Sequence, residues 1–322
     1  MAKKTTKKSS VRSHAAGSRS KKKTVRKAAS KKTAKKPAKK TAKKATKKAA
    51  SKKTAKKSTK KTAKRVSKRA GSKKIKPGKM VYSFGAITTE GDATMRELLG
   101  GKGANLADMT SIGLPVPPGF TITTETCQKY NQGGKRLPHN MMNEVHRHMA
   151  LVQKETKKVF GDAENPLLVS VRSGAKVSMP GMMDTVLNLG LNDEAVEGLA
   201  RQTGNKRFAY DAYRRLINMF GDVVMGVDHH RFEHAFDRIK NKYGASVDTE
   251  VPEEGMVELV EAYKEVYRSS VADPFPQNPF KQLELAIEAV FKSWDSERAV
   301  IYRRLNGITG LIGTAVSRPM EL

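Results

Sequence analysis

The chain of 322 residues carries 63 lysine and arginine residues against 31 aspartate and glutamate residues, and it has one cysteine. A single thiol excludes an internal disulfide, and no apolar run approaches the roughly 20 residues that a membrane-spanning helix needs. With no secretory signal near Met1, these features predict a cytoplasmic protein in a reducing compartment, without a membrane partner.

Residues 1–79 differ in composition from the rest of the chain. They hold 35 of the basic residues and none of the acidic ones, so residues 80–322 have 28 basic and 31 acidic residues. Lysine pairs alternate with Ala, Thr and Ser, and aromatic residues are absent. Such a segment cannot bury enough apolar area to offset its ordering entropy. We therefore expect a disordered basic tail that resembles the lysine-rich tails of histone-like proteins.

Composition leaves the role of this tail open. Lysine runs neutralise phosphates and release counterions, which predicts sequence-independent binding to nucleic acid and association with a nucleoid. The alternatives are a solubilising extension, a start codon placed too early, and a transit peptide, although transit peptides have an apolar face that this segment lacks. In the nucleic-acid interpretation, the contacts come from lysine pairs such as Lys35, Lys36, Lys39, Lys40, Lys43 and Lys44.

The part of the chain after the tail first predicts a lobe of mixed strands and helices over residues 80–192. Its elements follow from alternating or helical apolar spacing and from one polar N-cap. They are a strand at 80–85, a helix at 104–112, a strand at 120–123 that runs into a helix capped near Thr124, a helix at 141–159, and a buried strand at 167–171.

The sequence GGKG at residues 100–103 directly precedes the predicted helix 104–112. Free backbone N–H groups and the positive end of the helix dipole favour an anion there, and glycines let the backbone approach it closely. Gly101, Lys102 and Gly103 are therefore candidate phosphate-binding residues. No Ser or Thr follows the lysine, so this is not the Walker pattern. The alternative is an ordinary helix entry.

Two further features follow the buried strand. Arg172 stands at its carboxyl end, where a charge is either a site residue or one half of a structural ion pair. Residues 178–184, SMPGMMD, have no helical or strand period, which predicts a mobile flap. With Gly181, Met182 and Met183 it would exclude water from a reacting phosphate chain. The alternative is a buried methionine-rich loop.

Helical spacing dominates from residue 193, which predicts a helical insert over residues 193–275 with an aromatic stripe facing the core. Three histidines, His229, His230 and His234, lie close together, but without a complete ligand set we prefer a solvated helix face to a metal site. Residues 276–322 add two helices split near Trp294 and a strand that begins at residue 313.

Taken together and in this order, these features resemble the N-terminal, nucleotide-binding part of the pyruvate, phosphate dikinase family. The resemblance extends over about residues 80–316. It rests on the stretches LLGGKGANLADMTSIGLPVPPGFTITTETC, LLVSVRSGAKVSMPGMMDTVLNLGLND, GNKRFAYDAYRRLINMFGDVV and FKSWDSERAVIYRRLN.

The resemblance implies an α+β fold, namely the first lobe of an ATP-grasp domain with a helical insert. It also implies ATP as the ligand, with Lys102 and Arg172 on the triphosphate and Gly181, Met182 and Met183 in a closing loop. The family transfers the β,γ-pyrophosphoryl group of ATP to a histidine on a swivelling domain, passes the γ-phosphoryl group to inorganic phosphate, and gives the remaining phosphoryl group to pyruvate.

The resemblance ends shortly after the strand at residue 313, where the sequence continues as SRPMEL. We therefore expect the Mg²⁺ ligands beyond the chain end, and the phosphohistidine and pyruvate domains on a separate chain. Such a truncated segment would not run the full reaction alone. The alternatives are a nucleic-acid-associated protein that acts through its basic tail and has a degenerate nucleotide-binding domain, and a regulatory nucleotide sensor.

Overall fold

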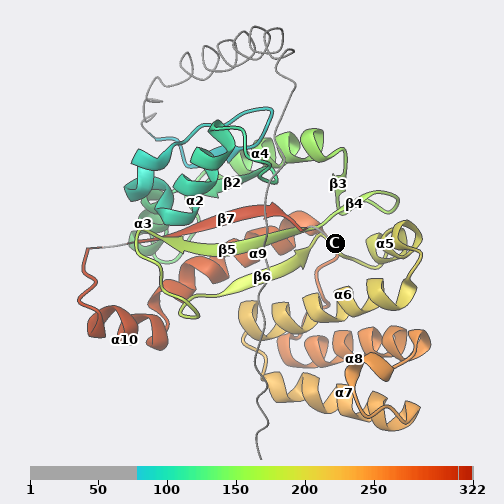
Figure 1. Ribbon diagram of the computed structural model, residues 1–322. Coiled ribbons are helices and arrows are strands. Elements are labelled where there is room, and N and C mark those ends of the chain that lie inside the picture. The colour runs from blue at the N-terminus through green and yellow to red at the C-terminus, as the bar shows by residue number, and fades with distance from the viewer. Residues whose placement is uncertain (1–77, 311, 321–322) are drawn as a thin grey trace, which may run out of the picture. The chain divides into compact units, whose positions relative to one another are not determined.

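A five-stranded antiparallel sheet organises the described part of the chain (Figure 1). The structure is a computed structural model that describes residues 78–310 and 312–320. The strand order is β1-β2-β7-β5-β6, so the last strand in sequence lies in the middle of the sheet. The strands are β1 (Val81–Phe84), β2 (Gly119–Ile122), β5 (Val169–Ala175), β6 (Thr185–Leu189) and β7 (Gly313–Pro319), and a separate parallel pair joins β3 (Val159–Phe160) to β4 (Pro166–Leu167).

Helices cover both faces of this sheet. The helix α2 (Arg96–Ser111) packs on one face, and α4 (Met141–Thr156) and α9 (Pro279–Lys292) pack on the other. Because side chains alternate along a strand, β1 and β7 contribute to apolar clusters on both faces of the sheet. Tyr82, Phe84 and Val316 belong to the clusters on the α2 side, and Val81, Phe120, Ile122, Val171 and Ala315 belong to the main core.

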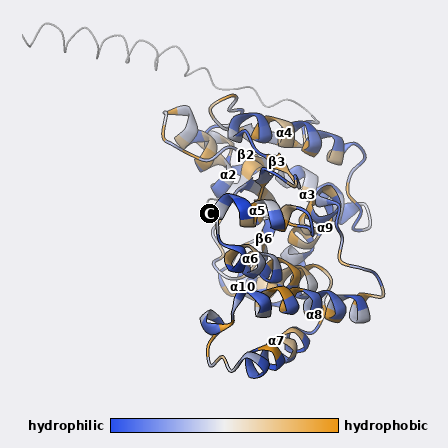
Figure 2. Cartoon of the chain, turned by 90° about the vertical axis from the view of Figure 1, so that its right-hand side faces the viewer, coloured by the Kyte–Doolittle hydropathy of each residue, from blue (hydrophilic) through white to orange (hydrophobic). Residues whose placement is uncertain are grey.

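The predicted helical insert is present as a stack of helices beside the sheet (Figure 1). Its helices carry hydrophobic residues along one side and hydrophilic residues along the other, as α7 and α8 show in Figure 2. The aromatic stripe is confirmed, since Tyr213 and Phe220 are fully buried. The elements are α5 (Ala195–Thr203), α6 (Lys206–Met219), the π-helix η2 (Phe220–Val224), α7 (His229–Tyr243), the 3-10 helix η3 (Asp248–Glu250) and α8 (Glu253–Val271).

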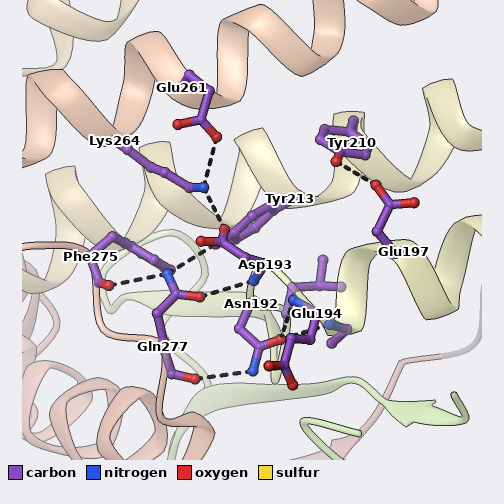
Figure 3. Close-up of polar contacts among 12 residues, drawn as sticks. Asn192, Asp193, Glu194, Glu197, Tyr210, Tyr213, Glu261, Lys264, Phe275 and Gln277 are labelled. Atoms are coloured by element: carbon purple, nitrogen blue, oxygen red, sulfur yellow. Dashed lines mark hydrogen bonds and ion pairs between the residues drawn. The ribbon is translucent and has the colours of Figure 1, made fainter. Parts of the chain in front are cut away.

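Polar contacts tie the insert to the rest of the fold at its two ends (Figure 3). Asp193 accepts a hydrogen bond from the Tyr213 hydroxyl at 2.8 Å and forms an ion pair with Lys264 of α8. Its backbone N–H donates to Oε1 of Gln277 at 2.9 Å. The segment before α5 and the segment after α8 are thus held at one point. The domain boundaries at residues 192 and 275 stay predictions.

The other predicted elements are present with small shifts. The helix expected at 141–159 ends at Thr156, because Lys157 adopts a left-handed backbone with a φ of 58° and the chain then enters β3. The split near Trp294 is confirmed as a short 3-10 helix. The remaining helices are η1 (Ala93–Met95), α3 (Thr124–Gln132), η4 (Ser293–Asp295) and α10 (Glu297–Leu305).

The predicted basic tail, with its six candidate lysines, lies outside the described residues except for Gly78 and Lys79. Within the described ranges, no helix combines the length and apolar character needed to cross a membrane.

Candidate functional site

The glycine-rich loop is part of α2, which is broken in its interior. Gly100 has φ 66° and ψ 172°, which divides α2 into two helical segments. The helix therefore begins earlier than predicted, because Leu98 and Leu99 are buried against the sheet and extend it towards the N-terminus. The second segment opens with residues 101–103, so their N–H groups stand at a helix N-terminus where no intrahelical acceptor is available.

The three glycines of this loop have different surroundings. A Cβ atom on Gly103 would lie 2.7 Å from Oγ1 of Thr121, so this glycine is needed for close packing of α2 on β2. Gly100 has a positive φ, and its Cβ would lie 3.3 Å from the backbone of Ala175. A Cβ on Gly101 would meet the carbonyl oxygens of Lys176 at 3.4 Å and Ala175 at 3.5 Å, which are ordinary contacts. Packing on the sheet therefore accounts for Gly100 and Gly103, and Gly101 alone faces a cavity.

Lys102 reaches from α2 to the sheet. Its Nζ donates a hydrogen bond to the carbonyl oxygen of Ser173 at 2.8 Å, and no Asp or Glu of the described chain forms an ion pair with it. Burial lowers the pKa of Lys102, and the nearby charge of Arg172 lowers it further. An ammonium group has three donors, so two of them remain for a ligand.

Arg172 lies in the middle of β5 and not at the carboxyl end of the strand as predicted, because pairing with β7 extends the strand to Ala175. Its Nε donates to Oγ of Ser170 at 3.4 Å. Burial lowers the pKa of Arg172, and the charge of Arg318 adds to this effect. Arg318 lies on β7 directly opposite Ser170, which puts it on the face of the sheet that carries Arg172. Neither arginine has an ion-pair partner within residues 78–310 and 312–320, so the structural ion pair considered for Arg172 is not present there.

Lys102, Arg172 and Arg318, hereafter the three-cation cluster, therefore gather without a neutralising carboxylate from the described part of the chain. Burial and a neighbouring positive charge lower the pKa values of Lys102 and Arg172, and such a grouping of cations favours an anionic ligand. The sequence analysis missed Arg318, because it followed the strand only as far as Val316. The signal that would have found it is alternation, since Arg318 is two residues after Val316 on the same strand and hence on the same face.

A cavity of about 650 Å³ lies between the start of the second α2 segment and the loop after β5. Among the sequence-predicted residues, Gly101, Lys102, Gly181 and Met183 line it, whereas Gly103, Arg172 and Met182 do not. Its wall has three basic side chains and no Asp or Glu. The lining residues are Arg96, Gly101, Lys102, Asn105, Ser173 to Ser178, Met179, Pro180, Gly181, Met183 and Thr185.

Residues 178–184, hereafter the methionine flap, form an exposed loop over one side of this cavity. Its three methionines are half-buried and its Pro180 and Gly181 are exposed, so the alternative of a buried methionine-rich loop is wrong. A turn closes the loop, with the N–H of Met182 donating to the carbonyl oxygen of Met179 at 3.2 Å.

Two aspartates, Asp184 and Asp193, and one of the three clustered histidines are engaged in other contacts. Asp184 forms an ion pair with Arg298, and Asp193 forms one with Lys264. His230 contacts Glu233 through Nδ1 at 2.8 Å. Nowhere in the described ranges do three or more His, Cys, Asp or Glu side chains form a group suited to a metal. Because the cavity wall has no carboxylate, it does not by itself fit Mg²⁺, which prefers oxygen ligands from acidic side chains.

The comparisons with known proteins agree with the predicted family, α+β fold class and nucleotide ligand. Residues 96–136 and 134–317 match the family model described as the pyruvate phosphate dikinase, AMP/ATP-binding domain. The chain is 55% identical over 239 residues to the chloroplastic pyruvate, phosphate dikinase of Flaveria pringlei and to pyruvate, phosphate dikinase 1 of Arabidopsis thaliana. It is 52% identical over 240 residues to the pyruvate, phosphate dikinase of Clostridium symbiosum.

These alignments cover 74% of this chain and 25%, 25% and 27% of the three relatives, respectively. The chain thus spans about a quarter of the length of the curated relatives it matches. The match runs through the broken helix, the cavity wall, the methionine flap and β7 as far as Ser317. By its AMP/ATP-binding domain, this chain belongs to the pyruvate, phosphate dikinase family.

Proposed function

We propose that the chain is the ATP-binding segment of a pyruvate, phosphate dikinase-like phosphotransferase, and that the three-cation cluster binds the triphosphate of ATP. The observation that carries this proposal is the grouping of Lys102, Arg172 and Arg318 beside a helix N-terminus without a carboxylate partner. Phosphoryl transfer depends mainly on charge neutralisation and alignment, and both are within reach of cations and backbone N–H groups.

In this proposal, the N–H groups of Gly101 and Gly103 point towards the phosphates from the start of the second α2 segment. Gly181, Met182 and Met183 of the methionine flap close over them and exclude water. The half-buried state of the methionines supports this role, because apolar side chains at a cavity mouth can move onto a ligand without breaking a core.

Mg²⁺ accompanies the nucleotide in our proposal, but its protein ligands lie outside this cavity wall. The family's transfer of a pyrophosphoryl group to histidine also needs an acceptor. The alignments cover about a quarter of the relatives, so our proposal concerns the ATP-binding step and not the steps that use the phosphohistidine and pyruvate domains. In this view the chain binds ATP but does not complete the reaction alone.

Calorimetric titration of ATP with Mg²⁺ into the full chain tests the proposal. We expect Lys102→Ala and Arg172→Ala each to weaken binding by about tenfold or more, because each removes a hydrogen bond to a charged group. The basic tail will also attract ATP, so a peptide of residues 1–79 is titrated at the same salt concentration as the reference. Binding to the full chain that equals binding to this peptide, or that both variants leave unchanged, overturns the proposal.

The basic tail supports a second candidate function, binding to nucleic acid. Its 35 basic residues without any acidic residue carry this suggestion. Fluorescence anisotropy with duplex DNA measures binding as salt rises, on the full chain and on a variant in which Lys35, Lys36, Lys39, Lys40, Lys43 and Lys44 are replaced by glutamine. We expect affinity to fall steeply with salt and the variant to show a shallower slope. No binding at low salt rules this function out.

A further inference from the structure

Arg298, in the first turn of α10, contacts the methionine flap from outside the cavity. Its Nε donates a hydrogen bond to the carbonyl oxygen of Met182 at 3.2 Å, and its Nη2 forms an ion pair with Oδ1 of Asp184. The backbone N–H of Asp184 in turn donates to Oγ of Ser293 at 3.3 Å. One end of the flap is therefore attached to the segment that joins α9 to α10. In Figure 1, α10 lies beside the loop between β5 and β6.

The side chain of Met183 lies next to the start of β7. A Cβ atom on Gly313 would lie 3.1 Å from Cε of Met183 and 3.0 Å from Cε3 of Trp294. Met183 also lines the cavity. The same methionine thus touches the cavity on one side and the start of β7 on the other, so a shift of the flap changes the cavity wall.

The helix α10 has few other attachments. Ala299 is its only buried residue, whereas Ile301 and Leu305 are exposed. Arg303 anchors the helix, because its guanidinium lies 4.2 Å from the Trp294 ring and Nη1 donates to the Trp294 carbonyl oxygen at 2.6 Å. Two arginines of α10 therefore have different roles. Arg303 holds the helix against η4, and Arg298 holds the methionine flap against the helix.

Asp184 depends on this contact. Its side chain is 21% exposed, burial raises the pKa of its carboxyl group, and Arg298 opposes that rise. An unpaired charge in a partly buried position raises the free energy of the folded state. Without Arg298, we therefore expect Asp184 to turn towards water and the flap to shift together with it.

We propose that Arg298 is a positioning residue, which holds the methionine flap so that Gly181 and Met183 stand against the nucleotide phosphates without touching the nucleotide itself. The inference rests on the proposed function for the ligand, but the attachment of the flap is a property of the free protein. The two can therefore be tested apart.

Hydrogen exchange of the full chain without nucleotide tests the attachment. In Arg298→Gln we expect the amides of residues 179–185 to exchange about tenfold faster, while those of α6 and α8 are unchanged. Arg304→Gln is the matched control, because this arginine belongs to the same helix and is exposed. Arg298→Lys keeps the ion pair with Asp184 but not the planar fork, so it should restore part of the protection. Unchanged exchange at residues 179–185 in Arg298→Gln overturns the proposal.

ATP binding to the same variants tests the positioning role. We expect Arg298→Gln to weaken ATP binding by three- to tenfold, through faster dissociation, and Arg304→Gln to leave it unchanged. Faster exchange with unaltered ATP affinity overturns the positioning role. A second outcome also overturns the positioning role: the wild-type chain binds ATP no more tightly than the peptide of residues 1–79, while Arg298→Gln still exchanges faster. That outcome rejects the proposed function but leaves the attachment of the flap supported.

Discussion

A Cβ atom on Gly174 would lie 2.4 Å from Oγ1 of Thr314, the residue directly opposite on β7. Thr314 is fully buried in the middle of the sheet, so neither strand can move away cheaply. We expect Gly174→Ala to lower the free energy of unfolding by about 1–3 kcal/mol, the usual range for overpacking. Urea denaturation of the full chain measures the change.

Gly101→Ala is the matched control for this clash. Its new Cβ would make ordinary contact at 3.4 Å, so we expect the free energy of unfolding to change by less than about 0.5 kcal/mol. Gly103→Ala should resemble Gly174→Ala, because its Cβ would lie 2.7 Å from Thr121. Equal stability of all three variants would show that the sheet and α2 are packed less closely than the structure describes.

Arg318 provides the second prediction. It lies one residue beyond the family match, which ends at residue 317, yet it neighbours Arg172. If it adds positive charge to the phosphate site, Arg318→Gln weakens ATP binding about three- to tenfold and makes the affinity less sensitive to salt. Arg201→Gln, an exposed substitution in the insert, should change neither quantity. Calorimetry at two salt concentrations compares them, and identical affinities for the wild type and Arg318→Gln would exclude Arg318 from the site.

His148 makes the stability of the fold depend on pH. It is buried on α4, its Nδ1 lies 2.5 Å from Oγ of Ser83, and burial lowers its pKa to about 4, although Glu90 opposes this shift. In the unfolded chain a histidine titrates near pH 6.5. Between these values the unfolded chain binds more protons than the folded one. Stability therefore falls as the pH drops from about 6.5 towards 4, and the effect is complete below that.

Urea denaturation at pH 7 and pH 5 measures this contribution. We expect the wild type to lose about 1–2 kcal/mol of unfolding free energy at pH 5 through His148. His148→Gln should lose less between the same pH values. The charged neighbours Lys79, Glu90, Glu144 and Arg147 remain in both proteins. An equal loss in the variant would assign the pH dependence to other groups.

The sequence predicted those features of the candidate site that depend on residues close together in the chain. The placement of Lys102 at a helix start and of Arg172 on a strand followed from glycines and apolar spacing within a few residues. The break at Gly100 could not be predicted in this way. Leu98 and Leu99 extend the helix towards the N-terminus because they are buried against the sheet, and this packing involves residues distant in the sequence.

The other omissions are contacts between distant parts of the chain. Arg318 joins Arg172 through strand pairing, and Arg298 reaches Met182 across 116 residues of sequence. Spacing within one segment carries no information about such partners. The same limit applies to Asp193, which the sequence marked only as an acidic residue at the start of the insert.

The contact of Asp193 with Tyr213 supplies the last prediction (Figure 3). Tyr213 is fully buried, and its hydroxyl donates to Asp193 at 2.8 Å while Lys264 pairs with the same carboxylate. Tyr213→Phe leaves the volume almost unchanged but removes this donor, so we expect the free energy of unfolding to fall by about 1–2 kcal/mol. Tyr210→Phe is the control: Tyr210 is only partly buried, its hydroxyl donates to Glu197 at 2.7 Å, and water can replace that bond. We expect a loss below about 0.5 kcal/mol in Tyr210→Phe.

If urea denaturation gives equal losses in the two variants, the contact at Asp193 contributes nothing specific to attachment of the insert. A larger loss in Tyr213→Phe, with exchange increased at both ends of the insert, shows that Tyr213 holds Asp193 in place for its contact with Gln277.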